Sequence, residues 1–289
     1  MSAAAVNTTE RMGGAGAAAA TATVATDAIA TTDLLTTFGL EKHGNVFARV
    51  VHDTRAFISG GSALYWWMNT QATTPSMKTS IPYMSDLDIW LPIPFASATE
   101  SLIRANGIYD FKKVSLLAFE LVLNAAGYVR QAPSGEDYSS CYTAKYIQSI
   151  HTFKHPTLKR KIQIIAIFDC KSPLDIVRTF DFDICSIVLR GVGAGDGTYA
   201  LKLMADSVPP HAVERICREK SMRLGMFFGE KPALGGILMR LEKYYSRGFA
   251  LEVPETPCSR CGHMDAHFKR LATYAEARIY VRAKFGAHM

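Results

Sequence analysis

The chain has 289 residues, of which 48% are apolar, so it is long enough to bury one large core or two modest ones. A net charge of +6 is compatible with a nucleotide or nucleic-acid partner but does not establish one. No apolar run reaches the roughly 18 residues of a membrane span and no segment resembles a signal peptide, which excludes a membrane partner and predicts an intracellular, reducing compartment.

The chain begins with a segment that predicts disorder. Residues 1–32 are mostly Ala, Thr, Gly and Ser, and they cannot bury enough apolar surface to offset the entropy lost on ordering. The first ordered element is expected in residues 44–56. There Val46, Val50 and Val51 fall near helical spacing, which predicts an amphipathic helix leading into the first strand.

A strand, a glycine turn and a helix are expected next. Residues 57–59 form a short apolar strand that ends in a glycine pair, and residues 62–68 form a helix with Ser62 as its N-cap. The polar, proline-containing residues 69–84 predict a loop. Residues 86–91 then alternate polar and apolar side chains, which predicts a strand.

Periodicity and turn residues predict an α+β fold for the remainder, with a mixed sheet flanked by helices. The chain becomes mostly helical after residue 205, so we predict a tail (1–32), an α+β core (33–205) and a helical subdomain (206–289). The further expected elements are helices at 111–126, 173–180, 211–224, 233–247 and 264–283, a hairpin at 144–153 and 161–168, and a strand at 182–189.

The pattern with the clearest chemistry joins the glycine turn to the next strand. Gly60 and Gly61 permit a sharp bend and a close backbone approach to a ligand, and the helix that follows offers free N–H groups to a triphosphate, with the Ser62 hydroxyl as a further donor. Asp86 and Asp88, two positions apart on a strand, point to the same face. Paired carboxylates repel unless a cation lies between them, and Mg²⁺ or Mn²⁺ suits such oxygen ligands.

A Gly-Gly-Ser turn followed by an Asp-x-Asp strand resembles the DNA polymerase β-type nucleotidyltransferase superfamily. The resemblance covers roughly residues 45–190. It implies a nucleotidyltransferase-type sheet, transfer of a nucleoside monophosphate from an NTP to a hydroxyl, and metal ions held by three carboxylates, the first two being Asp86 and Asp88. The stretches KIQIIAIF, SPLDIVRTFDFDICSI and LEKYYSRGF are similar to uncharacterised nucleotidyltransferase-like proteins of large DNA viruses, which would place the chain in the host cytoplasm or the virion.

The third carboxylate is less clearly marked in the sequence. On the neighbouring strand the matching position is Gln163, which is neutral, and the alternatives are Asp181 and Asp183. Asp183, at the start of an expected strand, is the favoured candidate, and the alternative for this segment is that Asp181 caps a helix end or starts a turn. The separation of Gly61 and Asp86 also exceeds that of compact family members, which implies an inserted loop.

Basic residues near the C-terminal end could close the triphosphate site. Arg240, Lys243 and Arg247 recur at helical spacing, and Lys243 or Arg247 would neutralise the leaving pyrophosphate. A solvated helix face is the alternative. The basic connection at residues 154–161 is open to the same two interpretations, phosphate binding or a solvated turn.

A second metal site is suggested by a Cys-x-x-Cys turn. Cys258 and Cys261, followed by His263 and His267, offer the four ligands of a tetrahedral structural Zn²⁺ site, and Cys217 could replace one of them. The alternative is two ordinary thiols and surface histidines.

The sequence therefore supports two functional hypotheses. In the first, Asp86, Asp88 and Asp183 hold the metal of a nucleotidyltransferase that uses NTPs, with RNA or DNA as a candidate acceptor through its 3′ end. In the second, the chain is a catalytically inactive nucleotidyltransferase-like module that binds nucleic acid or serves as a viral structural protein. Neither hypothesis specifies an oligomeric state.

Overall fold

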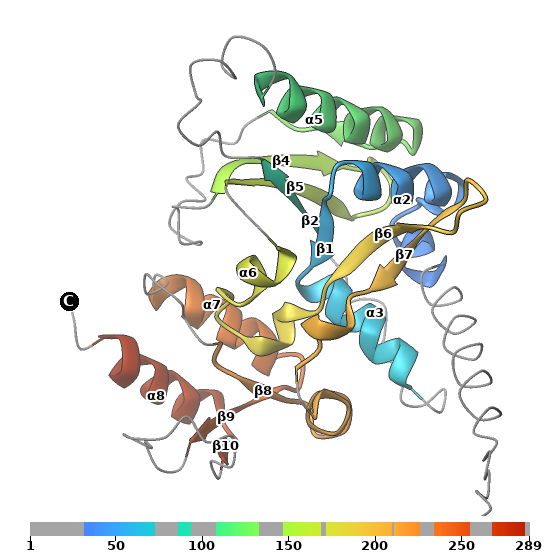
Figure 1. The fold of residues 1–289 in the computed structure, drawn as a ribbon. Helices are drawn as coiled ribbons and strands as arrows, with labels where there is room; N and C mark the ends of the chain where they lie inside the picture. The colour runs from blue at the N-terminus through green and yellow to red at the C-terminus, as the bar shows by residue number, and fades with distance from the viewer. Residues whose placement is uncertain are drawn as a thin grey trace, which may run out of the picture.

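The structure is a computed structural model (Figure 1). Most of the expected N-terminal tail and the whole Cys-x-x-Cys segment lie outside the residues that the structure describes. The described residues are 32–72, 86–93, 108–132, 147–168, 172–209, 211–225, 234–254 and 268–286.

A mixed sheet is the centre of the fold, as expected for an α+β protein. Within the described ranges it has seven strands in the order β3-β4-β5-β2-β1-β6-β7. The central β2 and β5 run parallel, and every other neighbouring pair is antiparallel. The strands are β1 (Phe57–Ser59), β2 (Asp86–Ile93), β3 (Val129–Arg130), β4 (Ile147–Lys154), β5 (Lys161–Phe168), β6 (Leu189–Gly193) and β7 (Tyr199–Leu203).

Alternation along the strands divides the core between the two faces of the sheet. Leu87 and Ile89 of β2 point to one face, where α2 (Gly44–Asp53) and α5 (Ile108–Ala125) cover the sheet (Figure 1). Trp90 points to the other face and packs under the short helix α6 (Pro173–Val177). Asp86 and Asp88 share the face of Trp90, so β2 carries its polar end on the α6 side.

The helix expected before β1 is confirmed as α2, but its buried stripe differs from the expected one. Phe47, Ala48 and Val51 are buried, whereas Val46 is 52% exposed. Positions 47, 48 and 51 share one helix face at i, i+1 and i+4, so the larger Phe47 directs that face inward.

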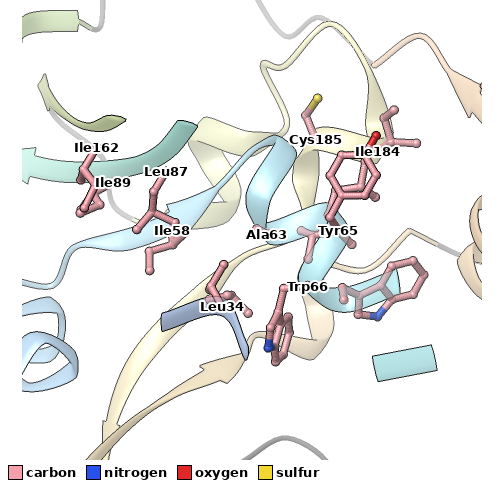
Figure 2. Close-up of a cluster of buried hydrophobic side chains, with 14 of the residues drawn as sticks. Leu34, Ile58, Ala63, Tyr65, Trp66, Leu87, Ile89, Ile162, Ile184 and Cys185 are labelled. Atoms are coloured by element: carbon pink, nitrogen blue, oxygen red, sulfur yellow. The ribbon is translucent and has the colours of Figure 1, made fainter. Parts of the chain in front are cut away.

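Helix α3 (Gly61–Gln71) is buried through its first two turns. Its residues from Ser62 to Met68 are all buried, and Figure 2 shows Tyr65 and Trp66 within the same core cluster as Ile58 and Leu87. The expected serine N-cap is wrong. The helix begins one residue earlier with Gly60 as its N-cap, and no side chain caps it.

The described residues after 205 are helical in the majority, as expected, but they also include strands that the sequence analysis did not predict. These strands form a three-stranded sheet in the order β10-β9-β8, in which Arg223 of β8 pairs with Glu252 of β9 at 2.9 Å. The expected helix at 211–224 is a short π-helix followed by β8. The elements are η7 (Val213–Arg218), β8 (Ser221–Arg223), α7 (Leu234–Tyr245), β9 (Ala250–Pro254), β10 (Phe268–Leu271) and α8 (Tyr274–Gly286).

The strand expected at 182–189 is also wrong, because only its last residue, Leu189, belongs to a strand. Residues Asp183–Ser186 form a 3₁₀ turn, η5, and the strand starts only at Leu189. The Ser186 hydroxyl donates to the Asp183 carbonyl at 2.6 Å, which closes the turn. Two further 3₁₀ turns are η1 (Glu41–His43) and η6 (Ala205–Ser207).

The helix expected at 264–283 is wrong in its first part, because residues 268–271 form β10 and α8 begins only at Tyr274. The helix expected at 173–180 is shorter than predicted and ends at Val177. The helix at 111–126 is α5, the hairpin is β4–β5, and α6 begins at Pro173 with a capping box formed by Ser172 and Asp175. Of the described helices, none combines the length and apolar character needed to cross a bilayer.

Candidate functional site

The two aspartates lie side by side in a row of polar residues across the sheet. Asp88 is in register with Ser59 of β1 on one side and Gln163 of β5 on the other, and Asp86 is in register with Lys161. In-register neighbours point to the same face, so these side chains share the face with Asp88. The expected convergence of Asp86 and Asp88 on one face is therefore present.

The glycine turn reaches the same place. Gly60 has φ +94°, a conformation that side-chain-bearing residues rarely adopt, and it directly precedes α3. A Cβ atom on Gly60 would lie 3.0 Å from the Asp88 Oδ2 atom. The turn thus lies against the Asp88 carboxylate, and only a residue without a side chain fits there without displacing that group.

A cavity opens where the turn, β2 and α7 meet. Its polar wall includes Gly60, Gly61 and Asp88 together with Lys243 of α7. Arg247 lies just after α7, with its Nη1 atom 3.7 Å from the Cβ position of Gly61. The glycine turn, Asp88 and the two C-terminal cations named from the sequence are therefore close together in space.

Part of the cavity lining is apolar and was not predicted from the sequence. Trp90 lies two residues beyond Asp88 on the same face of β2, and its ring centroid is 5.0 Å from that of Phe180. The alternation of side chains between the two faces of β2 and β5 was the only pattern in the sequence that could have predicted this part of the lining. Its members are Trp90, Ile147, Ile167, Ile176 and Phe180.

Cationic side chains lie close to both aspartates. Lys161 Nζ lies 3.3 Å from Asp86 Oδ2, so one aspartate already has a cationic neighbour. Burial first, and the charge of Asp86 second, raise the pKa of Asp88 to about 7, while Lys243 and Lys161 oppose the rise. The buried Asp88 Oδ1 atom accepts no hydrogen bond from the described residues.

Ser62 does not present its hydroxyl to a ligand, contrary to the expectation of a phosphate donor. Its Oγ donates a short hydrogen bond to the backbone carbonyl of Asp86, and the side chain is 2% exposed. Ser62 therefore links α3 to the start of β2, directly beneath the aspartate pair.

Asp183 faces away from the cavity, which corrects its expected place beside the pair. Its carboxylate accepts from Arg215 Nη2 at 2.5 Å and from the backbone N–H of Arg223 at 2.8 Å. The 3₁₀ turn that replaces the expected strand directs it toward η7 and β8. Burial raises the pKa of Asp183 in spite of Arg215.

Asp181, the other candidate from the sequence, does line the cavity but is already paired. Its carboxylate accepts a short hydrogen bond from Arg240 Nε of α7. On the neighbouring strand the ladder position beside Asp88 is Gln163, as the sequence indicated, and its Nε2 lies 3.4 Å from Thr152 Oγ1. An unpaired third carboxylate beside Asp86 and Asp88 is thus lacking among the described residues.

The donor set suits a hard cation shared with a phosphate. Within the described ranges, no three His, Cys, Asp or Glu side chains gather closely enough to hold a metal ion by themselves. Two carboxylates, one with an unpartnered oxygen, leave coordination positions for ligand oxygens, as Mg²⁺ and Mn²⁺ prefer. The expected zinc ligands Cys258, Cys261, His263 and His267 lie outside the described residues.

Comparison with known proteins assigns no family to the chain. No protein-family model matches the chain, and a search of curated proteins found no match.

Proposed function

We propose that the chain binds a nucleoside triphosphate together with a divalent cation in this cavity and transfers its nucleoside monophosphate to a hydroxyl group. One observation carries the proposal: the glycine turn at the start of α3 lies against the Asp88 carboxylate, where a Cβ on Gly60 would be 3.0 Å from Oδ2. A helix N-terminus that binds phosphates and a carboxylate that binds metal are the two parts that phosphoryl chemistry requires.

In this proposal, the helix N-terminus, the cationic side chains and the aspartates have separate roles. The backbone N–H groups at the start of α3 hold phosphate oxygens, and Lys243 and Arg247 add positive charge on the side of the leaving pyrophosphate. Asp86 and Asp88 would hold the cation, which supplies charge neutralisation at the phosphates. In the transfer, the acceptor oxygen forms a bond to the α-phosphorus and the bond to the bridging oxygen of pyrophosphate breaks.

A second candidate function is nucleotide binding without transfer. Gln163 favours it, because a neutral amide stands at the ladder position beside Asp88 where a third carboxylate would be expected. Asp181 and Asp183, the remaining candidates from the sequence, are paired with Arg240 and Arg215. Without a further carboxylate, the acceptor hydroxyl has no adjacent base.

The two candidates are separated by measuring binding and transfer on the same preparation. Each labelled NTP would be incubated with Mg²⁺ or Mn²⁺ and a panel of RNAs, DNAs and proteins, and its dissociation constant measured in parallel. The transferase proposal expects metal-dependent label on one acceptor class. Metal-dependent binding with no label on any acceptor would support the second candidate instead.

The site assignment is tested with a charge-removing variant of similar shape. Asp86→Asn/Asp88→Asn should lower transfer by at least about 100-fold because the cation loses both carboxylates. Asp206→Asn, which removes an exposed carboxylate outside the cavity lining, should leave transfer within about twofold. Transfer that survives the double change would refute the assignment.

A further inference from the structure

A buried ion pair joins α7 to the wall of the cavity. Asp181 is 6% exposed, and its carboxylate accepts from Arg240 Nε. Both residues line the cavity, on the side of α7 that also carries Lys243. Because Arg240 and Lys243 are three positions apart on a helix, they lie on neighbouring parts of its surface, and a contact that holds Arg240 also holds the helix from which Lys243 projects.

The segment that carries Asp181 also holds the glycine turn. The Cys185 carbonyl accepts from the Gly60 backbone N–H at 3.3 Å and from the Ser59 hydroxyl at 2.8 Å. The Cys185 Sγ atom lies 3.0 Å from the Tyr244 hydroxyl of α7. Residues 181–185 are therefore bonded to the phosphate turn on one side and to the cationic helix on the other.

The second cation of the site depends on the same helix position. The Arg247 guanidinium lies 5.5 Å from the ring centre of Tyr65 and 5.8 Å from that of Tyr244. Tyr65 belongs to α3 and Tyr244 to α7, so Arg247 lies between the two helices beside Gly61. A shift of α7 relative to α3 would move both Lys243 and Arg247 away from the turn.

Stability alone is a weak reason for a buried ion pair here. Two charges removed from water lose hydration that their attraction only partly restores, and apolar residues of similar volume often stabilise a fold equally well. What the charged pair adds is direction, because a guanidinium and a carboxylate meet in few geometries. A directional contact at this position sets the placement of α7.

We propose that the Asp181–Arg240 pair is a positioning contact that sets the affinity of the site for the triphosphate group, by holding α7 so that Lys243 and Arg247 face the glycine turn. This inference rests on the proposed function. It also accounts for Asp181 without a metal: its carboxylate holds α7 through Arg240.

The test replaces the pair without leaving a buried charge unpaired. In Asp181→Leu/Arg240→Met both charges are removed together, and Arg223→Met/Glu252→Leu removes a comparable pair from the β8–β9 sheet away from the cavity. We expect the dissociation constant for an NTP to rise about tenfold in the first variant and less than twofold in the control. The dissociation constant for the corresponding monophosphate should change less than twofold in both.

A purely structural role would give a different pattern. It would weaken NTP and monophosphate binding equally and would lower the thermal midpoint in proportion, and that result would overturn the proposal. Arg240→Lys, which keeps the charge, should retain part of the triphosphate preference. A wild-type preference that is fully preserved in the double variant would also overturn it.

Hydrogen exchange tests the contact whether or not nucleotide binds. In the double variant, the amides of α7 and of residues 60–64 should exchange faster together, while the control variant leaves residues 60–64 unchanged. If wild type binds no NTP but this joint loosening occurs, the proposed function fails and the positioning contact stands. Unchanged exchange at residues 60–64 would remove the link between the turn and α7.

Discussion

Gly60 is important to the site because it has no side chain. Its φ of +94° is strained for any other residue, and a Cβ would meet the Asp88 carboxylate at 3.0 Å. We expect Gly60→Ala to lower the free energy of unfolding by about 1–3 kcal/mol and to reduce NTP affinity by more than about tenfold. Chemical denaturation and a nucleotide titration would measure the two effects.

A matched glycine separates backbone strain from the effect on the site. Gly195 has φ +86°, and a Cβ there would meet nothing within 4 Å. Gly195→Ala should cost stability of similar magnitude, about 1 kcal/mol, with NTP affinity unchanged. Equal losses of affinity in the two variants would mean that Gly60 acts only through general stability.

Asp88 should make the stability of the protein depend on pH near neutrality. An aspartate in an unfolded chain titrates near pH 3.8, whereas the buried Asp88 titrates at about 7. Between these values the folded state holds a proton that the unfolded state has lost, so the free energy of unfolding falls as pH rises. The loss should be on the order of 2–4 kcal/mol between pH 4 and 8 in metal-free buffer.

The variant Asp88→Asn isolates this contribution, because an amide does not titrate. Its unfolding free energy, compared with that of wild type at each pH, should show a difference that grows in favour of the variant from pH 4 to 8 and is constant above that. In this comparison the contributions of the other carboxylates to the pH dependence cancel, including those of the buried Asp181 and Asp183. A difference that does not change with pH would show that Asp88 is ionised throughout.

For single residues of the site, the sequence predicted the structure where residue type and spacing determine the geometry. Asp86 and Asp88 share a face because strand side chains alternate, and a glycine pair after a strand predicts a tight approach. The role of Ser62 could not be predicted, since a serine after such a turn can cap the helix, bind a ligand or bond to a distant carbonyl. The Asp86 carbonyl that it reaches is 24 positions away.

Among the elements, the errors arose where tertiary pairing overrides local pattern. Residues 182–189 alternate like a strand, yet residues 183–186 form a turn whose Cys185 carbonyl accepts from the Gly60 N–H and the Ser59 hydroxyl, and the strand begins only at Leu189. That turn sends Asp183 to Arg215. Residues 250–254 form a strand because they pair with β8 and β10, two short segments that carry little signal of their own.

Lys243 of α7 and Arg247, just after the end of α7, should contribute to triphosphate binding through their charges. Lys243→Gln and Arg247→Gln should each weaken NTP binding by about 5–20-fold at low salt, and the effect should shrink as salt is raised because the contacts are electrostatic. The monophosphate, which lacks the terminal phosphates, should be affected less. Titrations of wild type and both variants with each nucleotide, at two salt concentrations, would measure these effects.

Removal of a distant charge provides the control for α7. Arg278 is exposed on α8 and lies outside the cavity lining, and Arg278→Gln changes the net charge by the same amount. Its NTP affinity should stay within about twofold of wild type. An equal loss in Arg278→Gln would point to the overall charge of the protein rather than to the position of α7.

At the scale of the whole molecule, the site joins parts that lie far apart in the chain. The turn and the aspartates come from residues 60–88, the connecting segment from residues 181–185, and the cations from residues 243–247. The sequence analysis identified residues of the first and third segments as parts of the site, but it placed the third segment in a separate subdomain. Their convergence depends on the packing of α7, which local periodicity does not specify.

Because the site spans the fold, a ligand that binds it should stabilise the molecule as a whole. A ligand that binds only the folded state adds about 2.7 kcal/mol at a concentration 100 times its dissociation constant. For a domain of this size such a gain corresponds to a rise in thermal midpoint of roughly 5–10 °C. We expect this rise with NTP and Mg²⁺ together and a much smaller one with either alone, since the carboxylates and the triphosphate share the cation. Asp86→Asn/Asp88→Asn should lose the cooperative part and keep a small metal-independent rise from Lys243, Arg247 and the α3 N-terminus. Equal rises with and without Mg²⁺ in wild type would instead mean that Lys161 and Lys243 already supply the positive charge, and that the aspartates hold no metal.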